Sequence, residues 1–263
     1  YYGGKSPPSP CLAARVRGLL ADEAARNRLP PPVRDWLDMQ RRRSVLPGPE
    51  GLLVEGFPRG GKHYLVCYPF EGRLAHQTLG MLMTRRMERA GHRPFGFVAS
   101  EYALAVWSLN RVEDVEPLFG EDMLGDDLEE WLAESNLVKR TFRNVALIAG
   151  LIDRRHPGQE KTGRQMTFSS DLIYDVLRKY EPDHILLRAT QADAATGLLD
   201  IGRLGDMLAR VKGRIDHRSL DRVSPLAVPL MLEIGREAVH GDSMEELLSE
   251  AAEDLINEAS CLL

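Results

Sequence analysis

Residues 52–70 read LLVEGFPRGGKHYLVCYPF, and this stretch decides the fold. Residues 52–57 and 63–70 are rich in the β-branched and aromatic side chains that are typical of strands. Between them, Gly60 and Gly61 supply the positive φ angles that a tight hairpin needs. The stretch therefore predicts an antiparallel β-hairpin.

A helix and two further strands are predicted directly after the hairpin. Residues 73–90 place their apolar side chains on one helical stripe, and residues 94–100 and 102–109 are again strand-like. The order strand, strand, helix, strand, strand predicts an α+β fold, in which a small antiparallel sheet carries a packed helix on one face.

The flanking regions are predicted to be helical. Before the hairpin, Pro30-Pro31-Pro32 separates a helix at 12–26 from one that ends at Arg43, and Pro47-Gly48-Pro49 forms a linker. After it, the predicted helices are 126–134, 135–152, 170–180, 203–212 and 243–259. We therefore expect three parts: a helical N-terminal extension and linker (1–47), the sheet with its helix (48–112) and a mainly helical subdomain (113–263).

Composition excludes several classes of protein. With 43% apolar and 28% charged residues in 263, the chain is globular rather than disordered. Cys11, Cys67 and Cys261 are too far apart for a disulfide framework or a cysteine zinc site. No apolar run is long enough to span a membrane. The start at Tyr1-Tyr2, without Met or a signal peptide, is interpreted as a fragment of a longer cytoplasmic protein.

Charge is distributed unevenly along the chain. The net charge of −5 argues against attraction of nucleic acid to the whole surface. Residues 113–134 form an acidic block without Lys or Arg, and a basic segment follows at 139–164. We call its cations the basic ridge: Lys139, Arg140, Arg143, Arg154, Arg155, Lys161 and Arg164. They are interpreted either as a surface that tracks phosphates or as a solvated face that pairs with the acidic block.

The junction at 69–77, PFEGRLAHQ, joins a predicted strand to a predicted helix. A helix start offers N–H donors and a positive dipole end to an anion. Phe70 would stack on a base, while Arg73, His76 and Gln77 would reach phosphate or base edges. The alternative is an ordinary connection with Phe70 in the core.

Other motifs carry little chemistry. Residues 56–62, GFPRGGK, match the phosphate-loop spacing, but His63 stands where Ser or Thr is needed and a strand follows instead of a helix. Neither His-Glu-x-x-His nor Gly-x-Ser-x-Gly occurs, and the acidic block lacks calcium-loop spacing. We therefore predict no catalytic residue, metal site or cofactor site in this chain.

Four long segments resemble those of a known family: residues 57–90 (FPRGGKHYLVCYPFEGRLAHQTLGMLMTRRMERA), 96–107 (GFVASEYALAVW), 137–155 (LVKRTFRNVALIAGLIDRR) and 224–237 (SPLAVPLMLEIGRE). They are similar to the C-terminal region, called the DEAD/H-associated domain, of Lhr-type helicases. The similarity is greatest to the ligase-associated DNA-damage-response DEXH-box subgroup. A tryptophan that other Lhr proteins carry in the first of these segments is replaced here by Thr78 or a near neighbour.

The resemblance implies a function for the longer protein. It implies an accessory module of an ATP-dependent 3′–5′ DNA helicase in DNA repair, which contacts single-stranded DNA or a tailed duplex through the basic ridge and the junction. ATP and magnesium would be bound by RecA-like domains outside this chain. The other implied partners are those domains, a winged-helix domain and ligase-associated repair proteins, with no membrane and a nucleoid location in a bacterium. The alternative is a structural or docking module that braces the ATPase core or recruits repair partners without touching DNA.

Overall fold

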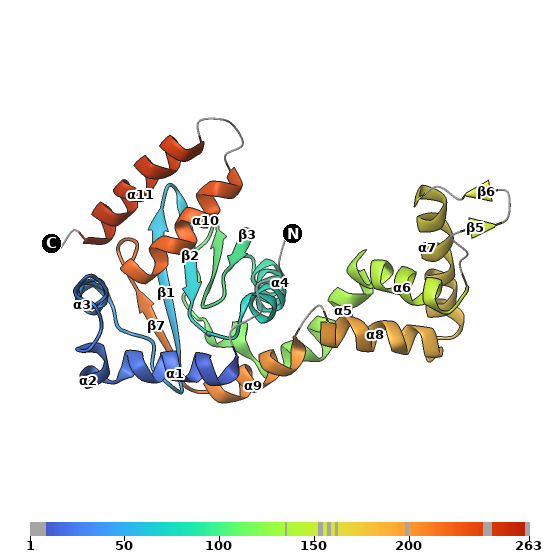
Figure 1. Cartoon of the computed structure of the whole chain (residues 1–263), viewed down its shortest axis with the longest axis horizontal. Coiled ribbons are helices and arrows are strands. Elements are labelled where there is room, and N and C mark those ends of the chain that lie inside the picture. The colour runs from blue at the N-terminus through green and yellow to red at the C-terminus, as the bar shows by residue number, and fades with distance from the viewer. Residues whose placement is uncertain are drawn as a thin grey trace. The chain divides into compact units, whose positions relative to one another are not determined.

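The computed structural model describes residues 9–134, 136–151, 155–156, 159–160, 163–197, 200–238 and 244–260. The chain forms two compact units (Figure 1). The sheet unit comprises residues 1–121 and 203–263, and the helical unit comprises residues 122–202. Each unit is described by itself.

A five-stranded sheet is the centre of the sheet unit. Its strands are β1 (Leu52–Arg59), β2 (Lys62–Cys67), β3 (Pro94–Ala99), β4 (Leu104–Ser108) and β7 (Ile215–Ser219), in the order β3-β4-β2-β1-β7. The first four pair antiparallel, whereas β7 runs parallel to β1. The α+β class and the order strand, strand, helix, strand, strand are thus confirmed. The fifth strand was not predicted, because its sequence IDHRS lacks an apolar run and lies at an edge of the sheet.

The predicted hairpin joins β1 to β2. Arg59 pairs with Lys62, and Gly60 and Gly61 between them have φ angles of 55° and 74°. Two successive positive φ angles are the signature of a type I′ turn, which matches the twist of the flanking strands. Because a strand follows Lys62, the GFPRGGK segment is a hairpin and not a phosphate loop.

Helix α4 (Arg73–Arg89) packs against β3 and β4 through Leu79, Leu82, Met83 and Met87, which are fully buried. A Cβ atom on Gly80 would lie 2.4 Å from the Phe97 ring, so only glycine permits this close approach. Helix α9 (Ile201–Val211) buries Leu204, Met207, Leu208 and Val211 along one side.

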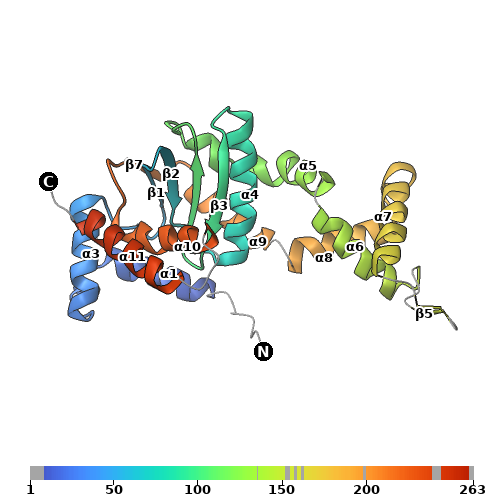
Figure 2. The same ribbon diagram turned by 90° about the horizontal axis from the view of Figure 1, so that it is seen from above.

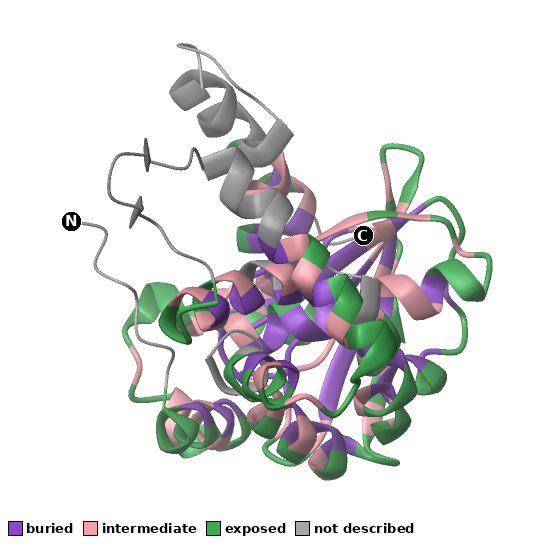
Figure 3. Cartoon of the chain, turned by 90° about the vertical axis from the view of Figure 1, so that its right-hand side faces the viewer, coloured by how far each residue is buried: buried purple, intermediate pink, exposed green. Residues whose placement is uncertain are grey.

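The other helices of this unit share a second core. Alternation along β1 turns Leu53 and Phe57 towards it. The core also takes side chains from α1 (Pro10–Ala21), α3 (Pro31–Arg43), α10 (Val228–Ala238) and α11 (Met244–Ser260). Figure 2 shows α10 and α11 lying together along the sheet, and Figure 3 shows that the strands are largely buried. Asp22 ends α1 and caps the short α2 (Glu23–Arg26), which divides the helix predicted at 12–26.

A buried carboxylate in this core has neutral partners. Glu55 accepts hydrogen bonds from Gln40 at 2.7 Å, from the Tyr68 hydroxyl at 2.7 Å and from the Ser224 hydroxyl. Burial, followed by the charge of Glu55, raises the pKa of Tyr68 well above its usual value, so the phenol remains a donor. These bonds join α3, β1, the residue after β2 and the segment before α10. They are needed because a buried carboxylate oxygen without donors would be costly.

The helical unit contains α5 (Asp126–Glu134), α6 (Asn136–Ile148), α7 (Gly163–Tyr180) and α8 (Ile185–Gly197), with the short strands β5 (Arg155–His156) and β6 (Gln159–Glu160). Its core is built from Val138, Phe142, Ala146, Tyr174 and Leu187. The Phe142 and Tyr174 rings meet edge to face, with their centroids 5.3 Å apart.

The structure divides the chain differently from the predicted 1–47, 48–112 and 113–263. Residues 203–263 return to the sheet unit, where they add α9, β7, α10 and α11. Sequence spacing does not show this return, because it depends on β7 pairing with β1 across more than 150 residues. No described helix is long and apolar enough to cross a membrane.

Candidate nucleic-acid interface

The junction between β2 and α4 has an unusual backbone. Phe70 has a φ angle of 64° and Gly72 one of 91°, and a positive φ is uncommon for a residue as bulky as phenylalanine. The N–H groups of Phe70 and Gly72 donate to the carbonyls of Tyr102 and Glu101, both at 3.1 Å. The turn between β3 and β4 thus holds the junction in this conformation.

Phe70 points into the protein. Its side chain belongs to the core that the sheet shares with α1, α3, α10 and α11, and the residue is 5% exposed. The centre of its ring lies 5.9 Å from that of Tyr102. It presents no ring face to a base, so its proposed role in stacking is corrected. The alternative, an ordinary connection with Phe70 in the core, describes its position.

Glu71 is the centre of a buried charge cluster. Its carboxylate accepts from Arg210 at 3.0 Å, Arg17 at 3.3 Å and Arg203 at 3.4 Å, and the three guanidinium side chains are only 9 to 15% exposed. Arg17 and Arg210 also donate to the carbonyl of Pro69 at 3.4 and 3.2 Å. The cluster therefore ties α1 and α9 to the junction.

The charges in this cluster do not balance one to one. Burial lowers the pKa of Arg17, the positive charge of Arg210 lowers it further, and Glu71 acts in the opposite direction. Glu71 is thus shared by several buried cations, and the charge of Glu50 and the carbonyls of Pro49 and Pro69 also stabilise Arg17. Its role in the structure is to hold the loop, because the groups are turned towards each other and away from solvent.

His76 is also internal, and its predicted contact with phosphate or base edges is corrected. It is 1% exposed; its Nε2 accepts from the Glu71 N–H at 3.0 Å, and its Nδ1 lies 2.7 Å from the Ser100 carbonyl. Both bonds are satisfied by the neutral ring with the proton on Nδ1. Burial lowers the pKa of His76 to about 4, so the ring is neutral at pH 7.

Arg73 and Gln77 remain on the surface. They are four residues apart on α4 and therefore share a face. Arg73 lies 3.7 Å from both Glu101 and Glu233, and its side chain is 46% exposed. The main-chain N–H of Arg73 donates to the Glu101 carboxylate at 3.1 Å, so one donor at the helix start already binds an anionic side chain.

The described part of the basic ridge lies against α7. Lys139 contacts Asp175 at 2.9 Å and lies 5.8 Å from the centre of the Tyr174 ring, while Arg143 contacts the Ser170 hydroxyl at 3.1 Å and Asp171 at 3.5 Å. The alternative interpretation pairs the basic ridge with the acidic block at 113–134. For Lys139 and Arg143, the acids in contact are on α7 and lie one helical turn apart.

Several predicted cations lie outside what the structure describes. Arg140 in α6, Arg155 in β5 and Arg164 in α7 have described backbones but no described side chains, and Arg154 and Lys161 lie outside the described residues altogether. Arg73 and the basic ridge belong to different units. The structure therefore brings together Lys139 and Arg143 on one surface, and Arg73 and Gln77 on another.

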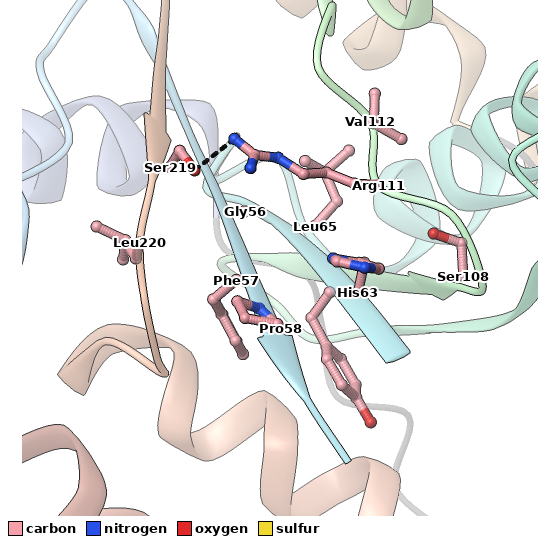
Figure 4. A pocket seen from close by; sticks show the side chains of 11 residues that line it. Gly56, Phe57, Pro58, His63, Leu65, Ser108, Arg111, Val112, Ser219 and Leu220 are labelled. Atoms are coloured by element: carbon pink, nitrogen blue, oxygen red, sulfur yellow. Dashed lines mark hydrogen bonds between the residues drawn. The ribbon is translucent and has the colours of Figure 1, made fainter. Parts of the chain in front are cut away.

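A small pocket lies at the end of the sheet opposite the junction (Figure 4). It has a volume of about 130 Å³, and its lining includes Gly56, Pro58, His63, Ser108, Arg111 and Ser219. Arg111 donates to the Ser219 hydroxyl at 2.7 Å. Among the residues described, no three His, Cys, Asp or Glu side chains form a group that would hold a metal ion.

The charge cluster was not predicted, although one signal for it exists. Arg203 and Arg210 are seven residues apart and so lie on one side of α9, next to its buried leucines. Two arginines on an apolar helix face predict a buried acceptor, because a buried cation must be paired. The sequence does not identify that acceptor as Glu71, which is more than 130 residues away. Arg111 carries no local signal because its partner comes from the unpredicted strand β7.

Known proteins resemble this chain over most of its length. It is 22% identical over 223 residues to the ATP-dependent helicase Lhr-Core of Methanocaldococcus jannaschii, which covers 83% of this chain and 26% of that protein. It is 25% identical over 218 residues to the ATP-dependent helicase Lhr-Core protein 2 of Thermococcus barophilus, which covers 80% and 25%. The chain thus spans about a quarter of the length of these relatives.

A solved structure shares the fold. Helicase Lhr of Mycobacterium smegmatis, bound to ssDNA and AMP-PNP, matches 88% of this chain and 32% of its own with a TM-score of 0.67 and 21% identity. These matches agree with the resemblance to Lhr-type proteins. A family model described as DEAD/H associated matches residues 46–227, well over half of the sequence, and the chain therefore belongs to the DEAD/H associated family.

Proposed function

We propose that this chain is an accessory module of an ATP-dependent 3′–5′ DNA helicase in DNA repair, and that it contacts single-stranded nucleic acid. The observation that carries the proposal is the fold shared with an Lhr helicase that was solved with ssDNA. The relatives named ATP-dependent helicases support the parent activity. ATP and magnesium would be bound by RecA-like domains outside this chain.

The contact surface proposed for this module is narrower than the predicted one. Arg73 and Gln77 are accessible, and Lys139 and Arg143 keep about a quarter of their side chains exposed. The remaining cations of the basic ridge are retained in the proposal. Phe70 and His76 are not, because the protein interior surrounds them.

Fluorescence anisotropy with a labelled oligo(dT) strand tests this proposal. A few phosphate contacts should give a Kd of roughly 10⁻⁴ to 10⁻⁶ M, and the logarithm of the affinity should fall with that of the salt concentration by about 0.7 per contact. Replacing Arg140 and Arg143 by Ala should therefore reduce this slope by about 1.4. Affinity that does not respond to salt, or a slope unchanged in the double variant, would count against a phosphate contact here.

A docking role is the second candidate, and an apolar stripe on α7 favours it. Leu172, Val176 and Tyr180 repeat every four residues and are 56%, 47% and 70% exposed. An exposed apolar stripe of this kind is typical of a protein contact. Replacing all three by Ser should leave binding to oligo(dT) unchanged but weaken association with purified RecA-like and winged-helix domains. Helix α11 is a poorer candidate, because Leu255 and Ala259 pack in the core.

A further inference from the structure

The pocket in Figure 4 has a glycine where a strand would normally carry a side chain. Gly56 lies inside β1, and its φ angle is not positive, so backbone conformation does not require glycine. A Cβ atom there would lie 3.4 Å from His217 Nε2, which is a van der Waals contact, so packing does not require glycine either. Glycine in a strand interior often marks the close approach of a ligand or of another backbone. Here it leaves the pocket open.

Polar groups from separate segments converge on this space. Arg111 extends from the loop after β4 to Ser219 on β7, and Figure 4 shows its guanidinium beside that hydroxyl. Ser108 donates its hydroxyl hydrogen to the Asn110 carbonyl at 2.8 Å, which leaves its oxygen as an acceptor. His63 is half-buried at the pocket. Pro58, Leu65 and Val112 supply apolar walls.

The charge around the pocket favours a neutral ligand over a phosphate. His217, beside Gly56, has its pKa lowered by burial and then by the positive charge of Arg111, while a hydrogen bond to the Glu113 main chain and the carboxylates of Asp114 and Asp216 act in the opposite direction. Arg111 thus shares this region with the carboxylates of Asp114 and Asp216, and Asp216 also pairs with Arg218 at 2.7 Å. These carboxylates offset the positive charges of Arg111 and Arg218, which weakens the attraction for a phosphate.

We propose that this pocket takes one unstacked nucleobase, with the acceptor edge of guanine against Arg111. The proposal rests on the proposed function, since a bound single strand would supply the base. Its volume of about 130 Å³ is close to that of the roughly 150 Å³ cavity that admits benzene, so the edge of a base can enter, while the sugar and phosphate stay outside. A pair of hydrogen bonds from arginine to guanine O6 and N7 is the commonest specific base contact. In a single strand, unstacked bases expose the edge that carries these two acceptors.

Titration of the chain with dGMP, dAMP and inorganic phosphate, followed by NMR chemical shifts, tests the pocket without DNA. The dGMP affinity should exceed the dAMP affinity by roughly 5- to 150-fold, the range expected for one good bidentate base contact. Phosphate at the same concentration should not displace dGMP. Arg111→Ala should abolish the preference for dGMP, and Gly56→Val should abolish binding by filling the pocket.

Arg218→Ala is the matched control. Arg218 is also a cation and lies on the edge strand β7, but it pairs with Asp216 at 2.7 Å and does not line the pocket, so dGMP binding should not change. Thermal unfolding checks that each variant folds. If Gly56→Val does not fold, Gly56→Ser is used to narrow the same space, and weaker dGMP binding is expected.

The outcomes separate the pocket from the proposed function. Equal affinity for dGMP and dAMP, or displacement of dGMP by phosphate, would overturn base recognition; the second result would identify an anion site. If oligo(dT) binds but the folded Arg111→Ala and Gly56 variants still prefer dGMP, the pocket proposal fails and the proposed function stands. If dGMP binds as expected but no single strand does, the proposed function fails and the pocket remains.

Discussion

The junction in the sheet unit and the basic ridge in the helical unit contain the same chemistry but differ in burial. Around Glu71, the side chains of Arg17, Arg203 and Arg210 are 9 to 15% exposed. On the α6–α7 face, Lys139 and Arg143 are 27% and 25% exposed, and their partners Asp175 and Asp171 are 55% and 35% exposed.

This difference indicates different roles. A buried cation cannot leave its carboxylate without a large desolvation penalty, whereas a cation at the surface exchanges its partner at little cost. The arginines of the junction therefore hold a loop in shape. Lys139 and Arg143 can exchange an aspartate for a phosphate, so the α6–α7 face is the better candidate for reversible contact with a polynucleotide.

The largest effect is expected from Glu71→Gln. The substitution leaves the buried arginines without their shared counter-ion, and removing one partner of a buried ion pair typically costs about 3–5 kcal/mol. Urea unfolding followed by circular dichroism measures the loss. Asp38→Asn, which removes the partner of Arg41 at 3.9 Å on the surface, is the control and should change stability by less than about 1 kcal/mol. Similar small losses in both variants would contradict the assigned role of the cluster.

Acid should weaken the junction through His76. Its pKa is about 4 in the fold and 6.5 when unperturbed, so the unfolded chain takes up the proton first. Stability is therefore complete above about pH 6.5 and falls as the pH decreases towards 4, by roughly 3 kcal/mol at about 1.4 kcal/mol per pKa unit.

The main cause of this low pKa is burial of the ring, and the positive charge of Arg203 acts in the same direction. In addition, the Glu71 N–H would face a second donor if Nε2 were protonated. Urea unfolding at pH 7, 6, 5 and 4.5 measures this dependence. His76→Gln is the comparison: its stability should vary less over this range, after an initial loss at pH 7. Parallel pH profiles for the two proteins would show that another group causes the acid sensitivity.

The α6–α7 face should bind single strands more tightly when its acids are neutralised. Asp171→Asn with Asp175→Asn keeps the size of both side chains but releases Lys139 and Arg143 from ion pairing. The affinity for oligo(dT), measured by anisotropy at low salt, should increase several-fold, because each phosphate contact no longer has to displace a carboxylate. Unchanged affinity would indicate that this face does not contact the strand.

The smallest effect is expected for the contribution of an ion pair on the α6–α7 face to the free energy of unfolding. A double-mutant cycle of Lys139→Ala and Asp175→Ala should give a coupling energy of about 0.2–1 kcal/mol, which is typical of exposed ion pairs. Urea unfolding of the four proteins measures it. A coupling energy as large as that of a buried pair would remove the distinction between the two regions.

The elements predicted correctly are those whose causes are local. The hairpin follows from Gly60 and Gly61 between two apolar strands, and α4 follows from the stripe that includes Leu79, Leu82 and Met83. Arg73 and Gln77 were predicted at a helix start and are found there, on the surface. Phe70 and His76 were expected beside them, but a positive φ angle and a buried hydrogen-bond network turn them inwards.

The amino-acid sequence alone determined the α+β class, the hairpin and the central helix, because each depends on residues within a few turns or strands of one another. It also determined the resemblance to Lhr-type proteins, because that rests on the order of residues in four segments and not on their contacts. Only the tertiary structure decided that β7 joins the sheet, that Glu71 is shared by arginines of α1 and α9, and that Arg111 reaches Ser219 across a pocket. Those contacts join segments more than 50 residues apart, and their partners are selected by burial and charge balance in the folded chain rather than by any local pattern.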